Sequence, residues 1–359
     1  VSIASGLTPT QQAVLIVAAV TAKTSLPVTA TNVAGVVTFA TKWTGPSSQQ
    51  LQVRYINEGI TASTYTVAAG VAGATDADPT AALDAVSSED FEYMVVLVDT
   101  TSTTLGQPFF LTYVNNRARP ESGLRGCLIG AFTGSSAAAV TLSTALNGHR
   151  AQLVWDRDGN YFTIEAAAAM AGMRARAEQD DPSVNLMLRV FNTWRPPYAA
   201  SSKISINEAK NALNNGISSI RYNRQGKAFV VLPITTRFQD ANGAADYRTL
   251  DTNKVTVVDS FADTLAIDWP IRFPDWKLTD DDDGPIADKV ANRRIVKSWV
   301  FGWLKDYESY GWVKNVSANE GNLVVSIGGL IPQGRASVKI PVDVIDWFKQ
   351  LDASLYQIG

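Results

Sequence analysis

Apolar residues of the first 80 positions recur in one helix-like segment followed by short strand-like runs. The segment AVLIVAAV at 13–20 follows the polar run TPTQQ, which is typical of a helix start, so we expect a buried helix over about 8–24 and not a signal sequence. The later runs are rich in Val, Thr and Ala and are separated by Gly, Pro, Ser and Asn. They predict strands of a small β-rich unit at 33–43, 50–56 and 63–72.

Between residues 81 and 190 the pattern alternates between helical segments and continuous apolar strands. The strands are YMVVLVD (93–99), CLIGAF (127–132) and AQLVW (151–155). Helices are predicted beside them at 78–88, 105–116, 135–146 and 163–179. Uninterrupted apolar strands that alternate with helices are typical of a mostly parallel sheet with covered faces. We therefore predict a layered α/β core domain.

The segment FNTWRPPYAASS at 191–202 combines prolines with small polar residues, so we place a domain boundary there. Beyond it the pattern predicts a helix ended by Gly216, a hairpin with its turn at NRQG, a helix over 254–273 and final strands from 322 to the end. The longest helix is predicted at about 286–311, where apolar residues recur at spacings of three and four.

The predicted fold class is α/β, or α+β overall, in three units. Residues 1–80 form an N-terminal helix and a small β-rich peripheral domain. Residues 81–190 form the α/β core. Residues 191–359 form a C-terminal α+β assembly domain that ends in a strand.

Composition narrows the functional classes. The 359 residues are 46% hydrophobic and 18% charged with a formal net charge of -3, as in a globular chain without general affinity for nucleic acid or anionic membranes. The single cysteine, Cys127, excludes an internal disulfide and a cysteine-based zinc site. No stretch approaches the roughly 18 consecutive apolar residues of a membrane-spanning helix.

Candidate catalytic chemistry is sparse. Any Ser-His-Asp or Cys-His mechanism must use His149, the one histidine. Ser135 or Ser136 is explained as a helix cap, and the glycines at 130 and 134 lack the Lys of a phosphate loop. We predict no catalytic, cofactor-binding or metal-binding residue and no enzyme activity. An α/β hydrolase that uses His149 and a carbohydrate-binding surface module within 25–80 remain the alternatives.

The acidic run TDDDDGPIAD at 279–288 precedes the helix predicted at 286. Pro285 suits a first helical position, and acids are favourable ahead of it at the positive end of the helix dipole. The ligand spacing of an EF-hand is absent, so capping is favoured over a cation site, which stays open. The helix itself carries Arg293, Arg294 and Lys297 with no acid among them. They are either a solvated face or a docking surface for an acidic partner.

Several segments in the C-terminal half, in order, carry a family resemblance. They are ISINEAKNALNNGISSIRYNRQGKAFVVLPITTRF, DYRTLDTNKVTVVDSF, FPDWKLTDDDDGPI, ADKVANRRIVKSWVFGWLKDYESYGWVKN and GRASVKIPVDVIDWFKQLDASLYQI. Together they resemble the contractile tail sheath proteins of phages, particularly the phage Mu-like type. The resemblance covers most of 25–359, densely from about 205, with looser matches upstream at SLPVTA, TFATKWTG and YMVVLVD. The acidic loop departs from the family with four aspartates where two are typical, and Val1 corresponds to a point inside family members, so we expect the N-terminal arm to be lacking.

The resemblance implies a structural subunit that polymerises as stacked hexameric rings around a tail tube and contracts to drive the tube through a host envelope. It implies no cofactor and no nucleotide hydrolysis. The implied partners are other copies of the chain, the tail tube protein, and baseplate and tail terminator proteins, without nucleic acid or membrane insertion. The implied location is the virion tail, after assembly in the host cytoplasm. Without the upstream arm, we expect the isolated chain to be monomeric. Host, phage or bacteriocin origin and contraction geometry stay open.

The same resemblance assigns two candidate sites. The chain ends in an apolar run, and family members add terminal strands to the sheets of neighbouring subunits, where exposed strand edges accept them. We expect Leu351, Ala353 and Leu355 to face an adjoining core, with Tyr356 and Ile358 anchoring the end; a strand in the chain's own sheet is the alternative. Because the family's C-terminal domain lies innermost, the tube-facing residues are expected to be Arg293, Arg294 and Lys297.

Overall fold

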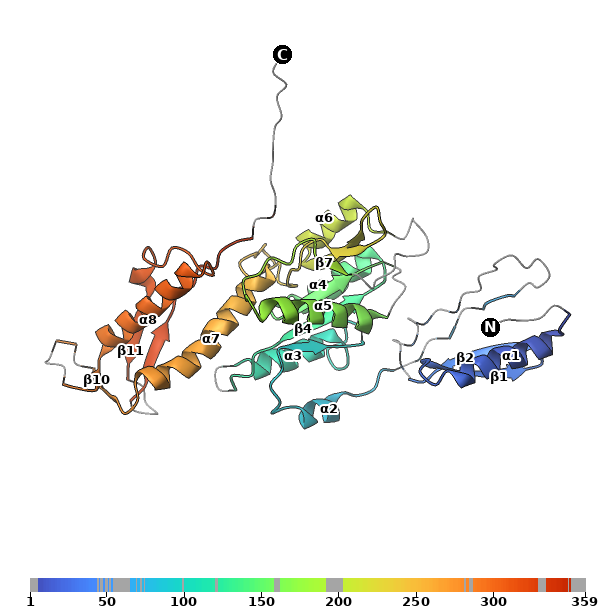
Figure 1. The fold of residues 1–359 in the computed structure, drawn as a ribbon, viewed down its shortest axis with the longest axis horizontal. Helices are drawn as coiled ribbons and strands as arrows, with labels where there is room; N and C mark the ends of the chain where they lie inside the picture. The colour runs from blue at the N-terminus through green and yellow to red at the C-terminus, as the bar shows by residue number, and fades with distance from the viewer. Residues whose placement is uncertain are drawn as a thin grey trace, which may run out of the picture.

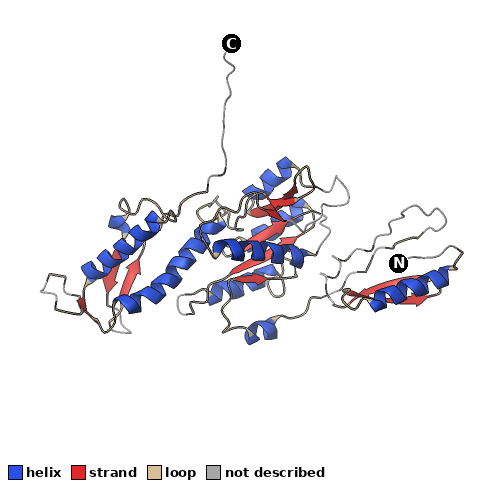
Figure 2. Ribbon diagram, viewed as in Figure 1, coloured by secondary structure: helices blue, strands red, loops and turns tan. Residues whose placement is uncertain are grey.

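The computed structural model places a small N-terminal unit, a central sheet and a C-terminal core side by side along its long axis (Figure 1). It describes residues 6–347 and Lys349, apart from position 99, the segments 120–121, 158–161, 192–202, 281, 284–286 and 329–333, position 348 and most positions between 44 and 74. Helices and strands are both present in the central and C-terminal parts (Figure 2), which confirms the predicted α/β class.

The N-terminal unit is a helix packed on a hairpin. Helix α1 (Pro9–Ala22) begins with a capping box at Thr8, and strands β1 (Val28–Val33) and β2 (Val36–Thr41) pair antiparallel. The helix lies where it was predicted, but the expectation that it is buried is wrong. Among its described residues only Ala13 is buried, and Val14 is 54% exposed, because the two-stranded hairpin covers just one side of it. Residues 65–68 and 70–71 of the strand predicted at 63–72 form no strand, and the strand predicted at 50–56 falls mostly outside the described residues.

A six-stranded sheet forms the centre of the molecule, in the order β3-β4-β5-β7-β8-β6. Its first four strands are parallel, as predicted, and the last two are antiparallel. The strands are β3 (Tyr93–Val95), β4 (Cys127–Phe132), β5 (Ala151–Trp155), β7 (Ile217–Tyr222), β8 (Ala228–Val230) and β6 (Val190–Phe191). The short helix α2 (Thr80–Ala85) precedes β3.

Neighbouring residues of each central strand enter two different cores, one on each face of the sheet. Leu128 and Leu153 pack on one face, while Ile129 and Val154 pack on the other. Three helices supply the first face: α3 (Gln107–Arg117), α4 (Ser136–Leu146) and α6 (Ile206–Asn214). Helix α5 (Thr163–Glu178) covers the second face. Both faces of β4 and β5 are buried, which explains why β4 is apolar throughout and β5 is apolar apart from Gln152.

The sheet continues across the boundary predicted at 191. Strands β7 and β8 follow that boundary in sequence, yet β7 pairs with β5 inside the sheet. Helix α6 ends just before Gly216, whose φ of 68° and close approach to the Thr236 backbone both require glycine. The predicted helix, glycine and hairpin are therefore confirmed, while the division of the chain into three domains stays a prediction.

A separate hydrophobic core lies at the C-terminal end, built around two helices. Helices α7 (Thr252–Arg272) and α8 (Arg293–Ser309) contribute Val257, Phe261, Val300 and Trp303, and Phe261 lies edge-on to Trp303 with ring centroids 5.3 Å apart. The smaller elements are β9 (Lys277–Leu278), β10 (Val290–Ala291), a 3₁₀ turn (Glu320–Asn322), β11 (Val324–Ile327) and β12 (Ala336–Lys339).

Two predictions for the last long helix are wrong: the residue at which it begins, and that it is the longest helix of the chain. Helix α8 begins at Arg293 and not at about 286, because the residues before it form β10, which pairs parallel with β9, and Asn292 caps the helix by accepting from the Ile295 amide. At 21 residues α7 is longer than α8, which has 17. Pro285 lies outside the described residues.

Candidate functional site

Helix α7 joins the central sheet to the C-terminal core (Figure 1), and its first turns meet a buried polar network on the α5 face of the sheet. The Arg174 guanidinium, 2% exposed, lies 2.7 Å from Glu178 Oε1, donates to Gln152 Oε1 at 3.1 Å and donates to Thr256 Oγ1 of α7 at 3.2 Å. Tyr93 donates its hydroxyl to the same glutamate. Burial raises the pKa of Tyr93 well above its ordinary value, so this hydroxyl stays a donor.

Ion pairs along the next turns of α7 extend this attachment to the start of β5, which Arg150 directly precedes. Arg150 donates to both carboxylate oxygens of Asp259 from its two terminal nitrogens, Nη1 and Nη2, and Nη2 lies 2.6 Å from Oδ1. Arg125 pairs with Asp263, one turn further along the same helix. Successive turns of α7 are therefore fixed to the sheet by side chains that come from three places in the sequence.

The C-terminal segment crosses this junction. We call residues 343–347 together with Lys349 the C-terminal strap. Its backbone pairs with the loop after α8: the Ile345 amide donates to the Trp312 carbonyl at 3.1 Å, and the Lys314 amide donates to the Asp343 carbonyl at 2.8 Å. The first residues of the strap are therefore bound by backbone hydrogen bonds to the C-terminal core.

The other contacts of the strap reach the sheet side of the junction. Trp347 donates its indole N–H to the Ser183 carbonyl at 2.9 Å, beyond the end of α5. The Lys349 ammonium lies 2.7 and 2.6 Å from the two oxygens of Asp251. Asp251 occupies the N-cap position of α7 without capping it, because its nearly buried carboxylate faces Lys349 instead. Asp346 lies 2.8 Å from both Lys254 and Lys314.

The acidic run and the basic residues of α8 prove to be neighbours. Asp282 Oδ1 accepts from the Arg293 amide at 3.2 Å, and its Oδ2 lies 2.7 Å from Arg293 Nη1. Arg294 donates to the carbonyl of Asp282. The Arg293 side chain, through its hydrogen bond, lowers the pKa of Asp282. Acidic charge therefore lies at the start of this helix, as predicted. It comes from Asp282, which lies 11 residues before Arg293 and folds back onto the helix, and not from a residue directly ahead of the first turn.

The three predicted tube-facing residues thus differ in their surroundings. Arg293 is compensated by Asp282, whereas the exposed Arg294 donates to the Asp282 carbonyl. Within the described part of the chain, neither Arg294 nor Lys297 forms an ion pair. The predicted inter-subunit residues, Leu351, Ala353, Leu355, Tyr356 and Ile358, lie outside the described residues.

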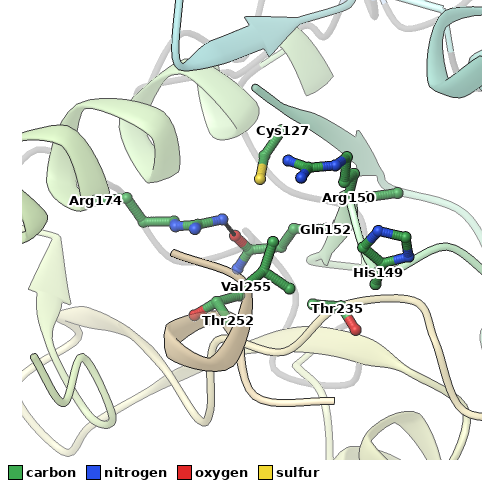
Figure 3. A pocket seen from close by; sticks show the side chains of 9 residues that line it. Cys127, His149, Arg150, Gln152, Arg174, Thr235, Thr252 and Val255 are labelled. Atoms are coloured by element: carbon green, nitrogen blue, oxygen red, sulfur yellow. Dashed lines mark hydrogen bonds between the residues drawn. The ribbon is translucent and has the colours of Figure 1, made fainter. Parts of the chain in front are cut away.

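The hydrolase alternative centres on His149, an exposed residue that borders a small space together with Cys127, Arg150 and Arg174 (Figure 3). The side chains close on one another and leave no room for a water-sized molecule. The His149 ring lies apart from the Cys127 thiol (Figure 3), and burial raises the pKa of that thiol to about 11, which keeps it protonated. Desolvation of the ring, followed by the charge of Arg150, lowers the pKa of His149. This arrangement does not favour a histidine-dependent hydrolase.

Sequence reasoning missed the charged groups that hold the junction together. Arg174 and Glu178 stand one turn apart on a helix, a spacing that ordinarily marks a solvated face. The long Ala run ahead of them was the available signal, since it indicates close packing of the helix against the sheet. The Lys349–Asp251 pair spans 98 residues of sequence and had no local signal.

The described residues include neither a candidate metal site nor a membrane-spanning helix. No group of three or more His, Cys, Asp or Glu is arranged to hold a metal ion among the residues that the structure describes. Within the same residues, no helix combines the length and the apolar character needed to cross a membrane.

Comparison with known proteins gives likeness at the level of the fold. No protein-family model matches the chain, and no curated protein matches it. Among solved structures, it is similar to the sheath tail protein of Desulfitobacterium hafniense (15% identity, 82% of this chain and 61% of that one, TM-score 0.49). It is also similar to the sheath tail protein of Listeria innocua (16% identity, 81% and 63%, TM-score 0.49).

A third similar structure is a chain of the anti-feeding prophage baseplate, at 12% identity over 80% of this chain and 76% of that one, with a TM-score of 0.52. The present chain spans less than two thirds of the length of the two sheath tail proteins. The likeness to the baseplate chain shows that this protein shares the fold of a subunit of that assembly.

Proposed function

We propose that the chain is a structural subunit of a contractile tail sheath, which polymerises as stacked hexameric rings around a tail tube and contracts to drive the tube through a host envelope. The observation that carries the proposal is the fold shared with a chain of the anti-feeding prophage baseplate, which extends over 80% of this chain. The ordered C-terminal motifs that resemble phage tail sheath proteins support it independently. The role is mechanical and not enzymatic.

The partners belong to the same proposal. They are other copies of the chain, a tail tube protein, and baseplate and tail terminator proteins. The site of action is the virion tail, after assembly in the host cytoplasm. The three predicted units would act as a peripheral domain, a sheath core and an assembly domain.

The apolar C-terminal end is the proposed link between copies. The strap fixes the chain as far as Lys349, next to Asp251 at the start of α7. The following residues, Leu351 to Ile358, would leave from this point and add a strand to a neighbouring subunit. An added strand brings backbone hydrogen bonds of about 0.5–1.5 kcal/mol net each, which suits a link that must hold while the globular bodies repack.

The tube-facing surface can be narrowed from the geometry. Arg293 is engaged by Asp282, so Arg294 and Lys297 carry the charge that an acidic partner would meet. We therefore propose that the tube contacts Arg294 and Lys297, while Arg293 holds the acidic loop through Asp282.

Electron microscopy of the full-length protein tests the proposal. Hollow, striated cylinders with sixfold end views are expected, and a variant without residues 348–359 should form none. A full-length protein that stays monomeric, with and without a cognate tube, would contradict the sheath function. Cylinders that form equally well without residues 348–359 would overturn only the role of the terminal strand.

A further inference from the structure

The C-terminal strap is held differently from the rest of the junction. Only Val344 and Trp347 of its described residues are buried apolar side chains, and its other attachments are hydrogen bonds and ion pairs. Segments with few buried apolar contacts open at a smaller free energy than the core around them. The strap is therefore the part of the junction that can detach while both cores stay folded.

Two charged anchors differ in their exposure. Lys349 binds both oxygens of Asp251. The Asp251 side chain is 4% exposed and that of Lys349 is 39% exposed, so salt screens this pair only in part. Asp346 bridges Lys254 of α7 and Lys314 of the loop after α8, but its side chain is 54% exposed. That bridge is open to screening by salt. Salt therefore screens the bridge through Asp346 more than the Lys349–Asp251 pair.

The anchors lie on the two sides of the junction. Lys314 belongs to the C-terminal core side, while Asp251 and Ser183 belong to the sheet side. A change in the angle between the two bodies would therefore pull on the strap. A strap that stayed closed would in turn resist that change.

We propose that the C-terminal strap is a latch: closed, it fixes the exit point of the chain's end at the junction of the two cores, and open, it frees Asp343 to Lys349 as additional linker. Seven extended residues span about 24 Å, so opening lengthens the reach of the terminal segment by up to that distance. The latch is a property of the isolated chain. Only its use rests on the proposed sheath function: the freed residues would lengthen the connection to a terminal strand that a neighbouring subunit holds while the subunits move.

Hydrogen exchange of the full chain tests the latch without any assembly. The reporters are the two amides whose hydrogen bonds join the strap to the loop after α8. The Ile345 amide donates to the Trp312 carbonyl, and the Lys314 amide donates to the Asp343 carbonyl. The double variant Asp251→Asn with Lys349→Met removes the Lys349–Asp251 pair without leaving a buried charge alone. The variant Asp346→Asn removes the exposed bridge. Lys305→Met, which breaks the Lys305–Glu308 pair on α8, is the matched control.

The double variant is expected to exchange the two reporter amides about ten- to a hundredfold faster, with the helical amides of α7 and α8 unchanged. Raising sodium chloride from about 0.05 M to about 1 M should speed exchange of the same amides in the wild type and have less effect in Asp346→Asn.

Unchanged reporter exchange in both strap variants would overturn the proposal. So would equal acceleration throughout α7 and α8, since the strap would then be part of the global fold and not a latch. If the reporter amides respond as expected but the full-length protein forms no sheath, the latch stands and only its proposed use is refuted.

Discussion

Asp282 binds Arg293 twice, with Oδ1 accepting from the backbone amide and Oδ2 lying 2.7 Å from the guanidinium. One carboxylate thereby fixes the acidic loop on the first turn of α8 and supplies negative charge where the helix dipole favours it. It also withdraws one of the three basic residues of this helix from contact with a partner.

Asp282→Ala should loosen the first turn of α8 because the Arg293 amide loses its acceptor and the loop loses its anchor. We expect faster hydrogen exchange at Arg293 and in β10, with the middle of the helix unaffected. Asp288→Ala, on an exposed residue of the same loop, is the control. Equal effects from the two substitutions would mean that general negative charge matters and the specific contact does not.

Charge reversal should separate the roles of the basic residues on α8. If the chain acts in the proposed sheath, Arg294→Glu and Lys297→Glu are expected to weaken its attachment to the tail tube, most strongly at low ionic strength where charges are least screened. Co-sedimentation of sheath and tube across a salt series measures this. Arg176→Glu, which reverses a charge that is 74% exposed on α5, should leave attachment unchanged. Attachment that is independent of both substitutions at every salt concentration would remove these residues from the interface.

The central sheet was predictable because its signals are local. The strand Cys127–Phe132 is apolar throughout, and Ala151–Trp155 is apolar apart from Gln152; both faces of each strand are covered. Helix starts with a capping side chain, at Thr8, Ser135 and Ser205, were equally readable. In each case neighbouring residues decide the conformation.

The candidate site was less predictable because distant residues decide it. Pro285 suggested an early start for α8, but the pairing of β10 with β9 keeps the chain extended up to Asn292. Sequence alone could not show that Asp282 folds back onto Arg293 or that Lys349 meets Asp251. The strand predicted to follow Lys349 stays a prediction.

Breaking the buried network between α5 and α7 should cost more than any surface change. Glu178→Gln leaves the Arg174 guanidinium buried without its counter-ion, which typically costs about 3–5 kcal/mol in the free energy of unfolding. Tyr93→Phe removes one hydrogen bond to the same glutamate and should cost about 1 kcal/mol. Urea unfolding measures both.

The double variant Arg174→Met with Glu178→Leu is the matched comparison for this network. It removes both charges and should recover much of the loss, because replacing a buried pair with apolar residues is often close to neutral. A double variant as unstable as Glu178→Gln would show that the hydrogen bonds to Gln152 and Thr256, and not the uncompensated charge, dominate.

The strap should also weaken in acid, in a range set by Asp346. Hydrogen bonds from Lys254 and then Lys314 lower the pKa of Asp346 from 3.8 to about 2. Because the folded pKa is below the unfolded one, the stabilisation is fully present above about pH 4 and is lost as the pH falls toward 2. The Asp346 side chain is more than half exposed, so its contribution to the free energy of unfolding is small. It is best measured as the difference in stability between the wild type and Asp346→Asn. The free energy of unfolding of the wild type should exceed that of Asp346→Asn at about pH 6, and the gap should close as the carboxylate becomes protonated. A gap that persists to pH 2 would mean that the asparagine disturbs packing of the strap, and that the ion pairs with the two lysines contribute nothing measurable.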